Sequence, residues 1–545
     1  MYCKYIKLLP DKLIRDRLCQ AKKQTHRIFA TKASPLLLLL ILLSSTPPAP
    51  ASERPFTLLT AVDTAIEYNT NLLIAKAQID TRSGSLQVAR GVFDPAIIIS
   101  TGGSIKKNYD ISDVAVVSGF QGETEYNAQY SLSLSKPLLL GGSIAFDVQM
   151  LRDDPIFTGA NTLGYQSEVA IQLNLALLRG AGTEFNSAQI RQAERELKAT
   201  QNDLVHILSA IVNDVTKAYW RYRAATKILA IQQEAVQRTE QQLKDMQRLI
   251  ELDERPSADL NQIVALLAAR KVDLAIVEQT QQRTKQDLGV LIGVPFAKFS
   301  TLTTPSDYFP ISSIDDLSTE VILIEVAKAS RFDLVALHER IIASKISLDA
   351  AQNGMLPRLD LSLSLGYRGL DITGKESAAI TAFASRAAGP NVALNLSYQW
   401  DINRNQAQGA IVSANAVYQQ GLYQQEFLIR SISSEVSLAR NALLRTQSQL
   451  DNAHSAMKKI QVALADEQKK LNRGMATVLD IIVLESQLLD AEKRYIGVQE
   501  LFADSIVELR FQSGTIIEQV NSTARVNRVA ITTPPTFNPD NKTRY

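Results

Sequence analysis

The residue types that most often carry out chemistry in enzymes are sparse along this chain of 545 residues. Nothing in it has the spacing of a nucleophile elbow, a P-loop or a dinucleotide-binding loop. The histidines are isolated, with no second histidine or cysteine beside them: His26, His206, His338 and His454. The two cysteines, Cys3 and Cys19, both lie near the N-terminus. The sequence therefore predicts no catalytic site, no bound cofactor and no metal site.

Two aspartates follow breaks in otherwise continuous helical patterns. Asp259 comes after Arg255 and Pro256, and Asp480 comes after Gly474. Proline and glycine interrupt helices, so each break predicts a turn between two helices. A carboxylate in the first turns after such a break stabilises the helix N-terminus, and that is the purely structural interpretation of both residues.

The segments next to these turns are predicted to be very long helices. Residues 187–250 contain no proline or glycine, and their apolar residues recur every three or four positions, as they do again over residues 429–464. This spacing places one apolar stripe along a helix. A helix of this length spans about 96 Å, so it must pack lengthwise against other helices. With a return helix after each break, the sequence predicts two long antiparallel helical hairpins.

The N-terminal 51 residues have the layout of a secretory signal peptide. A basic stretch precedes the apolar residues 36–43, and Ala49 and Ala51 form a small-residue cleavage signal. This apolar run reaches about 12 Å as a helix, well short of a bilayer core of about 30 Å. The remaining chain carries 49 basic and 54 acidic residues, a net charge of −5. That charge gives no indication of nucleic-acid binding.

A second periodicity, of two residues, predicts β-strands. Apolar residues alternate with Ser, Asn and Gln over residues 126–135, 169–175, 359–367 and 392–400. About ten residues of such alternation are typical of a transmembrane β-strand, although a half-buried strand of a soluble protein has the same pattern. Repeated segments of this kind in an exported chain, several with an aromatic residue near one end, favour a membrane β-barrel.

The chain repeats its own pattern once. Residues 65–95 match residues 327–357 at an offset of 262, and from residue 193 onward the offset is 221. We therefore expect two structural repeats, residues 52–300 and 318–520, joined by a linker at 301–317. The first repeat is 41 residues longer (262 minus 221), and its extra residues, about 124–151, predict an additional β-hairpin. That hairpin either widens the barrel or forms an extracellular lid.

Residues 521–545 are polar and contain three prolines. This composition predicts a disordered tail.

Together these features resemble the TolC-like outer-membrane efflux protein family. Residues 58–72 are similar to the family's opening segment, and later motifs match residues 177–180 (LLRG), 215–222 (VTKAYWRY) and 288–295 (LGVLIGVP). The resemblance covers residues 56–515. It implies an α+β membrane protein with two internal repeats, in which a transmembrane β-barrel shared between subunits continues into a long periplasmic α-helical barrel.

The resemblance also implies an assembly and a function. The expected assembly is a homotrimer with a shared barrel of twelve strands, set in outer-membrane lipid with a periplasmic extension. It would serve a tripartite efflux or type I secretion system as a passive duct, with a periplasmic adaptor and an inner-membrane transporter as partners. The few strands in one chain agree, because the smallest membrane barrels need about eight and open edges cannot face lipid. The alternative is a periplasmic adaptor or a coiled-coil scaffold without a membrane barrel.

In this family the helix turns form a narrow tip that can carry rings of aspartate. Asp480 falls on an acidic position of that tip, and Asp259 on the equivalent place in the first repeat. A threefold axis would turn either residue into a ring of carboxylates, which favours cations. Val483 and Ala476 stand where relatives can carry a second acid and a gating arginine, so a salt-bridged gate is not expected.

Overall fold

A computed structural model of the chain describes residues 56–109, 122–154, 164–252, 258–311, 314, 316–372, 378–473, 475–520 and 523–536. These residues belong to one compact unit that begins at Pro55. The predicted signal peptide, residues 1–51, lies outside the described residues.

Helices and strands alternate in blocks along the chain. The first block is α3 (Leu58–Tyr68), α4 (Thr70–Gly91), β1 (Ala96–Tyr109), β2 (Gly122–Pro137), β3 (Gly142–Asp154), β4 (Gly164–Ala176), α6 (Thr183–Asn186), α7 (Ala188–Glu251), α8 (Ala258–Leu291) and η2 (Phe296–Thr301). The second is α9 (Glu320–Ser330), α10 (Phe332–Asn353), β5 (Arg358–Asp371), α11 (Ala378–Thr381), η3 (Ala382–Ala384), β6 (Gly389–Gln399), α12 (Asn405–Asn472), α13 (Val478–Gln512), β7 (Ile517–Val520) and β8 (Thr523–Val526).

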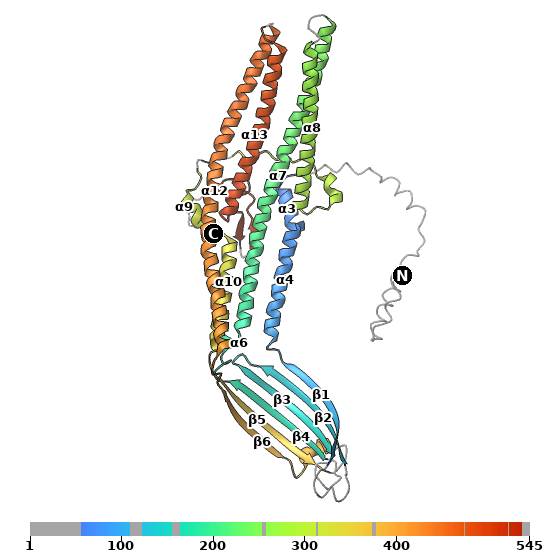
Figure 1. Cartoon of the computed structure of the whole chain (residues 1–545), viewed down its shortest axis with the longest axis vertical. Coiled ribbons are helices and arrows are strands. Elements are labelled where there is room, and N and C mark those ends of the chain that lie inside the picture. Colours follow the sequence, from blue (N-terminus) through green and yellow to red (C-terminus); the bar gives the residue numbers. More distant parts are fainter. Residues whose placement is uncertain are drawn as a thin grey trace, which may run out of the picture. The chain divides into compact units, whose positions relative to one another are not determined.

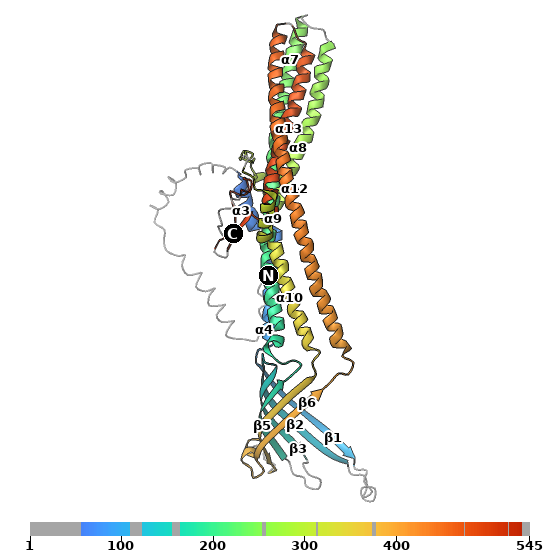
Figure 2. The same ribbon diagram turned by 90° about the vertical axis from the view of Figure 1, so that its left-hand side faces the viewer.

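The long helices form two hairpins. α7 is 64 residues long, as the periodicity predicts, and α12 is 68 residues long. α8 packs along α7 and α13 packs along α12, while α7 also contacts α13, α4 and α10 (Figures 1 and 2). Each helix thereby buries its apolar stripe lengthwise against its neighbours.

Six strands form one antiparallel sheet in the order β1-β2-β3-β4-β5-β6, next to the helix ends (Figure 1). The segments with predicted alternation are all strands. β2 and β3 form the predicted additional hairpin, which pairs with β1 on one side and with β4 on the other. β1 is a strand that the alternation did not reveal, because three isoleucines in a row and the pair Gly102-Gly103 interrupt the pattern.

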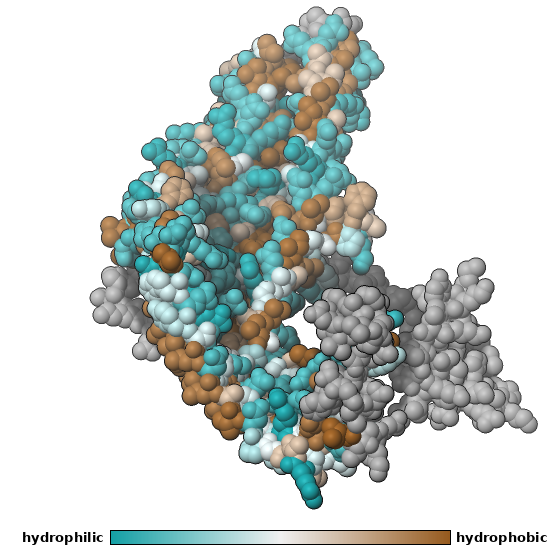
Figure 3. Space-filling view, turned by 60° about the horizontal axis from the view of Figure 1, so that its bottom comes forward, coloured by the Kyte–Doolittle hydropathy of each residue, from teal (hydrophilic) through white to brown (hydrophobic). Residues whose placement is uncertain are grey.

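The sheet has one apolar and one polar face. Cross-strand pairing places six exposed apolar residues in one row across all six strands: Ile97, Leu134, Phe146, Ile171, Leu365 and Val392. A row on the opposite face contains Ser100, Ser131, Gln149, Glu168 and Arg368. In Figure 3, hydrophobic side chains gather along the lower left, at the strand end of the chain. An exposed apolar surface of this extent requires lipid or another protein to cover it.

The main buried core lies midway along the helices, where α3 and α7 meet the residues that follow η2. Trp220 packs against Tyr219 and Phe309, with ring centroids 5.2 and 5.4 Å apart. Asp307 accepts hydrogen bonds from the Tyr219 hydroxyl at 2.7 Å and from the Leu58 amide at 2.6 Å. The predicted linker is therefore packed against the first long helix in this stretch.

The C-terminal segment differs from its sequence prediction. β8 pairs with β7, and Ala530 and Ile531 are buried. The prediction of a disordered tail from residue 521 is therefore wrong for residues 523–536. Their few apolar side chains, among them Val526 and Ile531, pack against the main apolar core. Residues 537–545 lie outside the described residues.

Candidate functional site

Both predicted helix turns fall between helix ends. α7 ends at Glu251 and α8 begins at Ala258, while α12 ends at Asn472 and α13 begins at Val478. Arg255, Pro256 and Gly474 lie outside the described residues. Asp259 belongs to the first turn of α8, and its side chain is not among the described ones.

The two turns lie at the same end of the helices. The Gln242 amide, close to the end of α7, donates a hydrogen bond of 2.8 Å to the Glu485 carboxylate, close to the start of α13. Figures 1 and 2 both show the tips of the hairpins on the side away from the strands. The chain segments that carry Asp259 and Asp480 are therefore brought to one end of the protein.

Asp480 forms a capping box at the start of α13. Its Oδ2 accepts hydrogen bonds from the Thr477 amide at 2.9 Å and from the Thr477 hydroxyl at 2.6 Å, and its own amide donates to Thr477 Oγ1 at 3.3 Å. The hydroxyl and then the amide of Thr477 lower the pKa of the exposed Asp480 carboxyl. The side chain thus stabilises the helix end and also presents a negative charge to solvent.

A buried arginine close to the same end was not predicted from the sequence. The Arg270 side chain on α8 is only 4% exposed, and its Nη1 donates to the Ala235 carbonyl at 2.9 Å and to the Thr239 hydroxyl. Its Nη2 lies 4.0 Å from Glu485 on α13. Burial lowers the pKa of Arg270, and the charge of Glu485 opposes that shift. One guanidinium therefore links α7, α8 and α13.

A second buried arginine joins three helices of the second block, α10, α12 and α13. Arg331 donates to Asp333 at 2.7 Å, to Glu435 at 2.8 Å and to Gln512 at 2.9 Å. Burial alone would raise the pKa of Asp333, but the hydrogen bonds and charge of Arg331 outweigh it and lower that pKa. This cluster fixes the start of α10 against α12 and α13.

One carboxyl on α13 titrates close to neutral pH. Burial first, and then the charge of Glu500, raise the pKa of Asp504 to about 7. Its Oδ1 has no hydrogen-bond partner among the described residues. The group therefore exists in both protonation states near neutral pH, one turn from the ion pair between Lys217 and Glu508.

Two of the isolated histidines take part in aromatic packing. His206 lies 5.7 Å from the Phe511 ring, and His454 stacks on Tyr495 at 5.2 Å. Within the described residues, no group of three or more His, Cys, Asp or Glu side chains is placed to hold a metal ion. Among the helices that the structure describes, none has the length and apolar character needed to cross a membrane.

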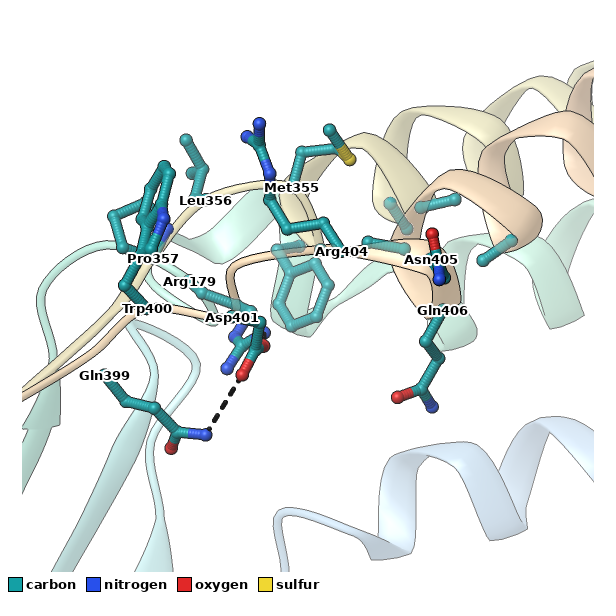
Figure 4. Close-up of a pocket in the computed structure, with 16 residues that line it drawn as sticks. Arg179, Met355, Leu356, Pro357, Gln399, Trp400, Asp401, Arg404, Asn405 and Gln406 are labelled. Atoms are coloured by element: carbon teal, nitrogen blue, oxygen red, sulfur yellow. Dashed lines mark hydrogen bonds and ion pairs between the residues drawn. The ribbon is translucent and has the colours of Figure 1, made fainter.

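A cavity of about 630 Å³ lies where the sheet joins the helices (Figure 4). Asp401 accepts hydrogen bonds from Arg179 at 2.8 Å and from Gln399 at 3.2 Å. The Arg404 guanidinium lies over the Trp400 ring, 4.9 Å from its centroid. Arginine and tryptophan at the ends of strands are typical of a membrane interface.

Comparison with known proteins assigns the fold. Residues 323–515 match the sequence model of the outer membrane efflux protein family. The crystal structure of the Campylobacter jejuni CmeC outer membrane channel superposes with a TM-score of 0.64 over 85% of this chain and 86% of that one, at 14% identity. The resemblance to the TolC-like outer-membrane efflux proteins is confirmed. The VceC outer membrane protein of Vibrio cholerae gives a TM-score of 0.61 over 84% of this chain and 96% of its own, at 16% identity.

A relative named pyoverdine export outer membrane protein OpmQ, from Pseudomonas putida, is 22% identical over 311 residues. The match covers 56% of this chain and 62% of that relative, which is less than two thirds of its length. In this chain the family sequence model spans the second block of elements from α9 to the end of α13, including the capping box of Asp480.

Proposed function

We propose that the chain is the outer-membrane channel of a tripartite efflux or type I secretion system, a passive export duct without catalytic activity of its own. The observation that carries this proposal is the six-stranded sheet with one exposed apolar face, joined directly to helices of 64 and 68 residues. Such a sheet suits lipid on its apolar face and water on its polar face.

The duct requires several copies of the chain, and we propose a homotrimer in the outer membrane. Open strand edges cannot face lipid, so strands of neighbouring copies would close the barrel. The helices would continue it into the periplasm, where the hairpin turns meet a periplasmic adaptor and, beyond it, an inner-membrane transporter. The similar order of elements in the two blocks supports an internal duplication, with repeats at 52–300 and 318–520 around a linker at 301–317.

A periplasmic adaptor or a coiled-coil scaffold accounts less well for the sheet. In either of those proteins the apolar row from Ile97 to Val392 would face water. The described residues favour the channel for this reason.

The proposal is tested by fractionation followed by conductance measurements. We expect the mature protein to remain in the outer-membrane fraction after salt and alkaline extraction, and to form pores in a planar bilayer after purification. Release of the protein by alkaline extraction would instead support the adaptor or scaffold.

At the hairpin turns, we propose that Asp480, together with Asp259, lines the tip constriction. Asp480→Asn removes the charge but keeps an acceptor oxygen for the cap. We expect the cation preference of the pore to fall toward that of an unselective channel, because a ring of carboxylates is lost. The measurement is the reversal potential of the pore in a salt gradient.

Thr477→Ala is the matched control, because it removes the other half of the capping box and leaves the charge. Amide exchange in the first turn of α13 should become about fivefold faster, which corresponds to ~1 kcal/mol for a lost cap, with unchanged ion selectivity. If Asp480→Asn also leaves selectivity unchanged, Asp480 has only the capping role.

A further inference from the structure

The additional hairpin is an integral part of the sheet. β1 pairs with β2 from Ala96–Ser135 to Tyr109–Gly122, and β3 pairs with β4 from Gly142–Leu175 to Asp153–Gly164. The hydroxyl oxygens of Ser100 on β1 and Ser131 on β2 lie 2.6 Å apart. The hairpin therefore connects β1 to β4 over nearly the full length of both strands.

The hairpin has the same two faces as the rest of the sheet. Leu134 and Phe146 continue the apolar row between Ile97 and Ile171. On the opposite face, Ser133 pairs with Asp147. A lid outside the membrane has no need for an apolar row in register with membrane strands, whereas a segment of barrel wall does.

The two outer strands of the sheet have edges that lack charges and proline over most of their length. β1 carries no charged residue from Ala96 to Ile105, and its charges, Lys106 and Lys107, lie near its far end. β6 carries no charge from Gly389 to Gln399, and its one proline, Pro390, stands at the start of the strand. Each outer strand has one neighbouring strand among those that the structure describes. Soluble proteins protect such edges with charges, proline or a covering segment, so edges of this kind indicate a partner strand.

A second copy of the chain supplies that partner with the correct direction. The strands of an antiparallel sheet alternate in direction, so β1 and β6 run in opposite senses. β6 of one copy can therefore pair antiparallel with β1 of the next copy, and repetition of this head-to-tail contact closes a ring. The outer strands run in opposite directions in a sheet of four strands and also in a sheet of six, because both numbers are even.

We propose that the hairpin β2–β3 is barrel wall, so that each copy contributes six strands and a trimer encloses eighteen, in place of the twelve that the family resemblance implies. This inference rests on the proposed trimeric channel. With strands about 4.8 Å apart and tilted by about 40°, the backbone diameter rises from about 24 to about 36 Å. Barrels of 16–18 strands enclose a water-filled lumen, so the barrel would not be the narrowest part of the duct.

Engineered disulfides test the position of the hairpin in the membrane-inserted full-length protein. Both native cysteines lie within the predicted signal peptide, so the mature protein carries no competing thiol. Ser100→Cys with Ser131→Cys bridges β1 and β2, and Ala145→Cys with Gln172→Cys bridges β3 and β4, each at paired positions. Ser362→Cys with Asn395→Cys on β5 and β6 is the control, because that pairing exists with or without the hairpin in the wall.

We expect the two hairpin pairs to oxidise to the same extent as the control pair. A fourth pair, Ser100→Cys with Glu168→Cys, reports direct contact between β1 and β4 and should stay reduced. Oxidation of this fourth pair, with both hairpin pairs reduced, would overturn the proposal and make the hairpin a lid.

Electron-microscope images along the pore axis provide an independent measurement. We expect three copies around a barrel of about 36 Å backbone diameter, and a diameter of about 24 Å would overturn the proposal. Extraction of the protein from the outer membrane at alkaline pH would refute the channel itself, while the disulfide pattern would still report the place of the hairpin.

Discussion

Replacing Arg270 with methionine is expected to separate the two helical hairpins close to their turns. The guanidinium is 4% exposed, and its loss leaves the Ala235 carbonyl, the Thr239 hydroxyl and the Glu485 carboxylate without a common partner. Removing one member of a buried charged pair destabilises a protein by about 3–5 kcal/mol. We expect Arg270→Met to lower the thermal midpoint of the protein and to speed amide exchange at the ends of α8 and α13 that lie next to the turns.

The neighbouring residue provides the matched control. Lys271 also lies on α8 and pairs with Glu240 on α7 at 2.9 Å, but the two side chains are 55% and 43% exposed. Exposed pairs contribute about 0–1 kcal/mol, so Lys271→Met should leave both measurements almost unchanged. Equal effects from the two variants would show that the Arg270 contacts do not hold the hairpins together.

Long periodic patterns are the part of the fold that the sequence predicts well. α7 begins at Ala188 and ends at Glu251, against a predicted helix over 187–250. Each turn of such a helix repeats the same apolar spacing, so many residues independently indicate a helix. The alternating strands were predicted for the same reason, and β1 was missed where Ile97, Ile98 and Ile99 break the alternation.

The position of the extra hairpin could not be predicted from periodicity. An alternating pattern predicts on which face of the sheet each side chain lies, but it does not identify the neighbouring strand. The pairing of Ser100 with Ser131, and of Ala145 with Gln172, depends on residues about 30 apart in sequence. Only the assembled sheet shows that β2 and β3 separate β1 from β4.

In the candidate site too, the sequence predicts a residue with a local signal and misses one whose contacts come from other helices. Asp480 was found because a break in a helical pattern precedes it, and the threonine three residues earlier completes a recognisable capping signal. Arg270 lies seven residues after the buried Ile263, on the same stripe of α8. In the sequence, a charged residue on an apolar stripe only interrupts the hydrophobic pattern. The role of Arg270 depends on hydrogen-bond acceptors from α7 and a carboxylate from α13, which the pattern of α8 does not contain.

A loss of stability as large as that of Arg270→Met is expected from Trp220→Ala. Trp220 is 1% exposed and lies between Tyr219 and Phe309, where α7 meets the chain that follows η2. Truncating a buried tryptophan to alanine costs about 3–5 kcal/mol, since the apolar contacts are lost and a cavity remains. The measurement is the thermal midpoint of the solubilised protein, followed by far-ultraviolet circular dichroism.

Trp220→Phe separates packing from any role of the indole nitrogen. Trp220 Nε1 has no hydrogen-bond partner among the described residues, so phenylalanine removes a buried unpaired N–H while it keeps an aromatic ring against Tyr219 and Phe309. We expect a loss of about 1–2 kcal/mol, because the smaller cavity is partly offset by the removal of that group. If the phenylalanine variant is as unstable as the alanine variant, the nitrogen has a partner and ring packing is not what stabilises this core.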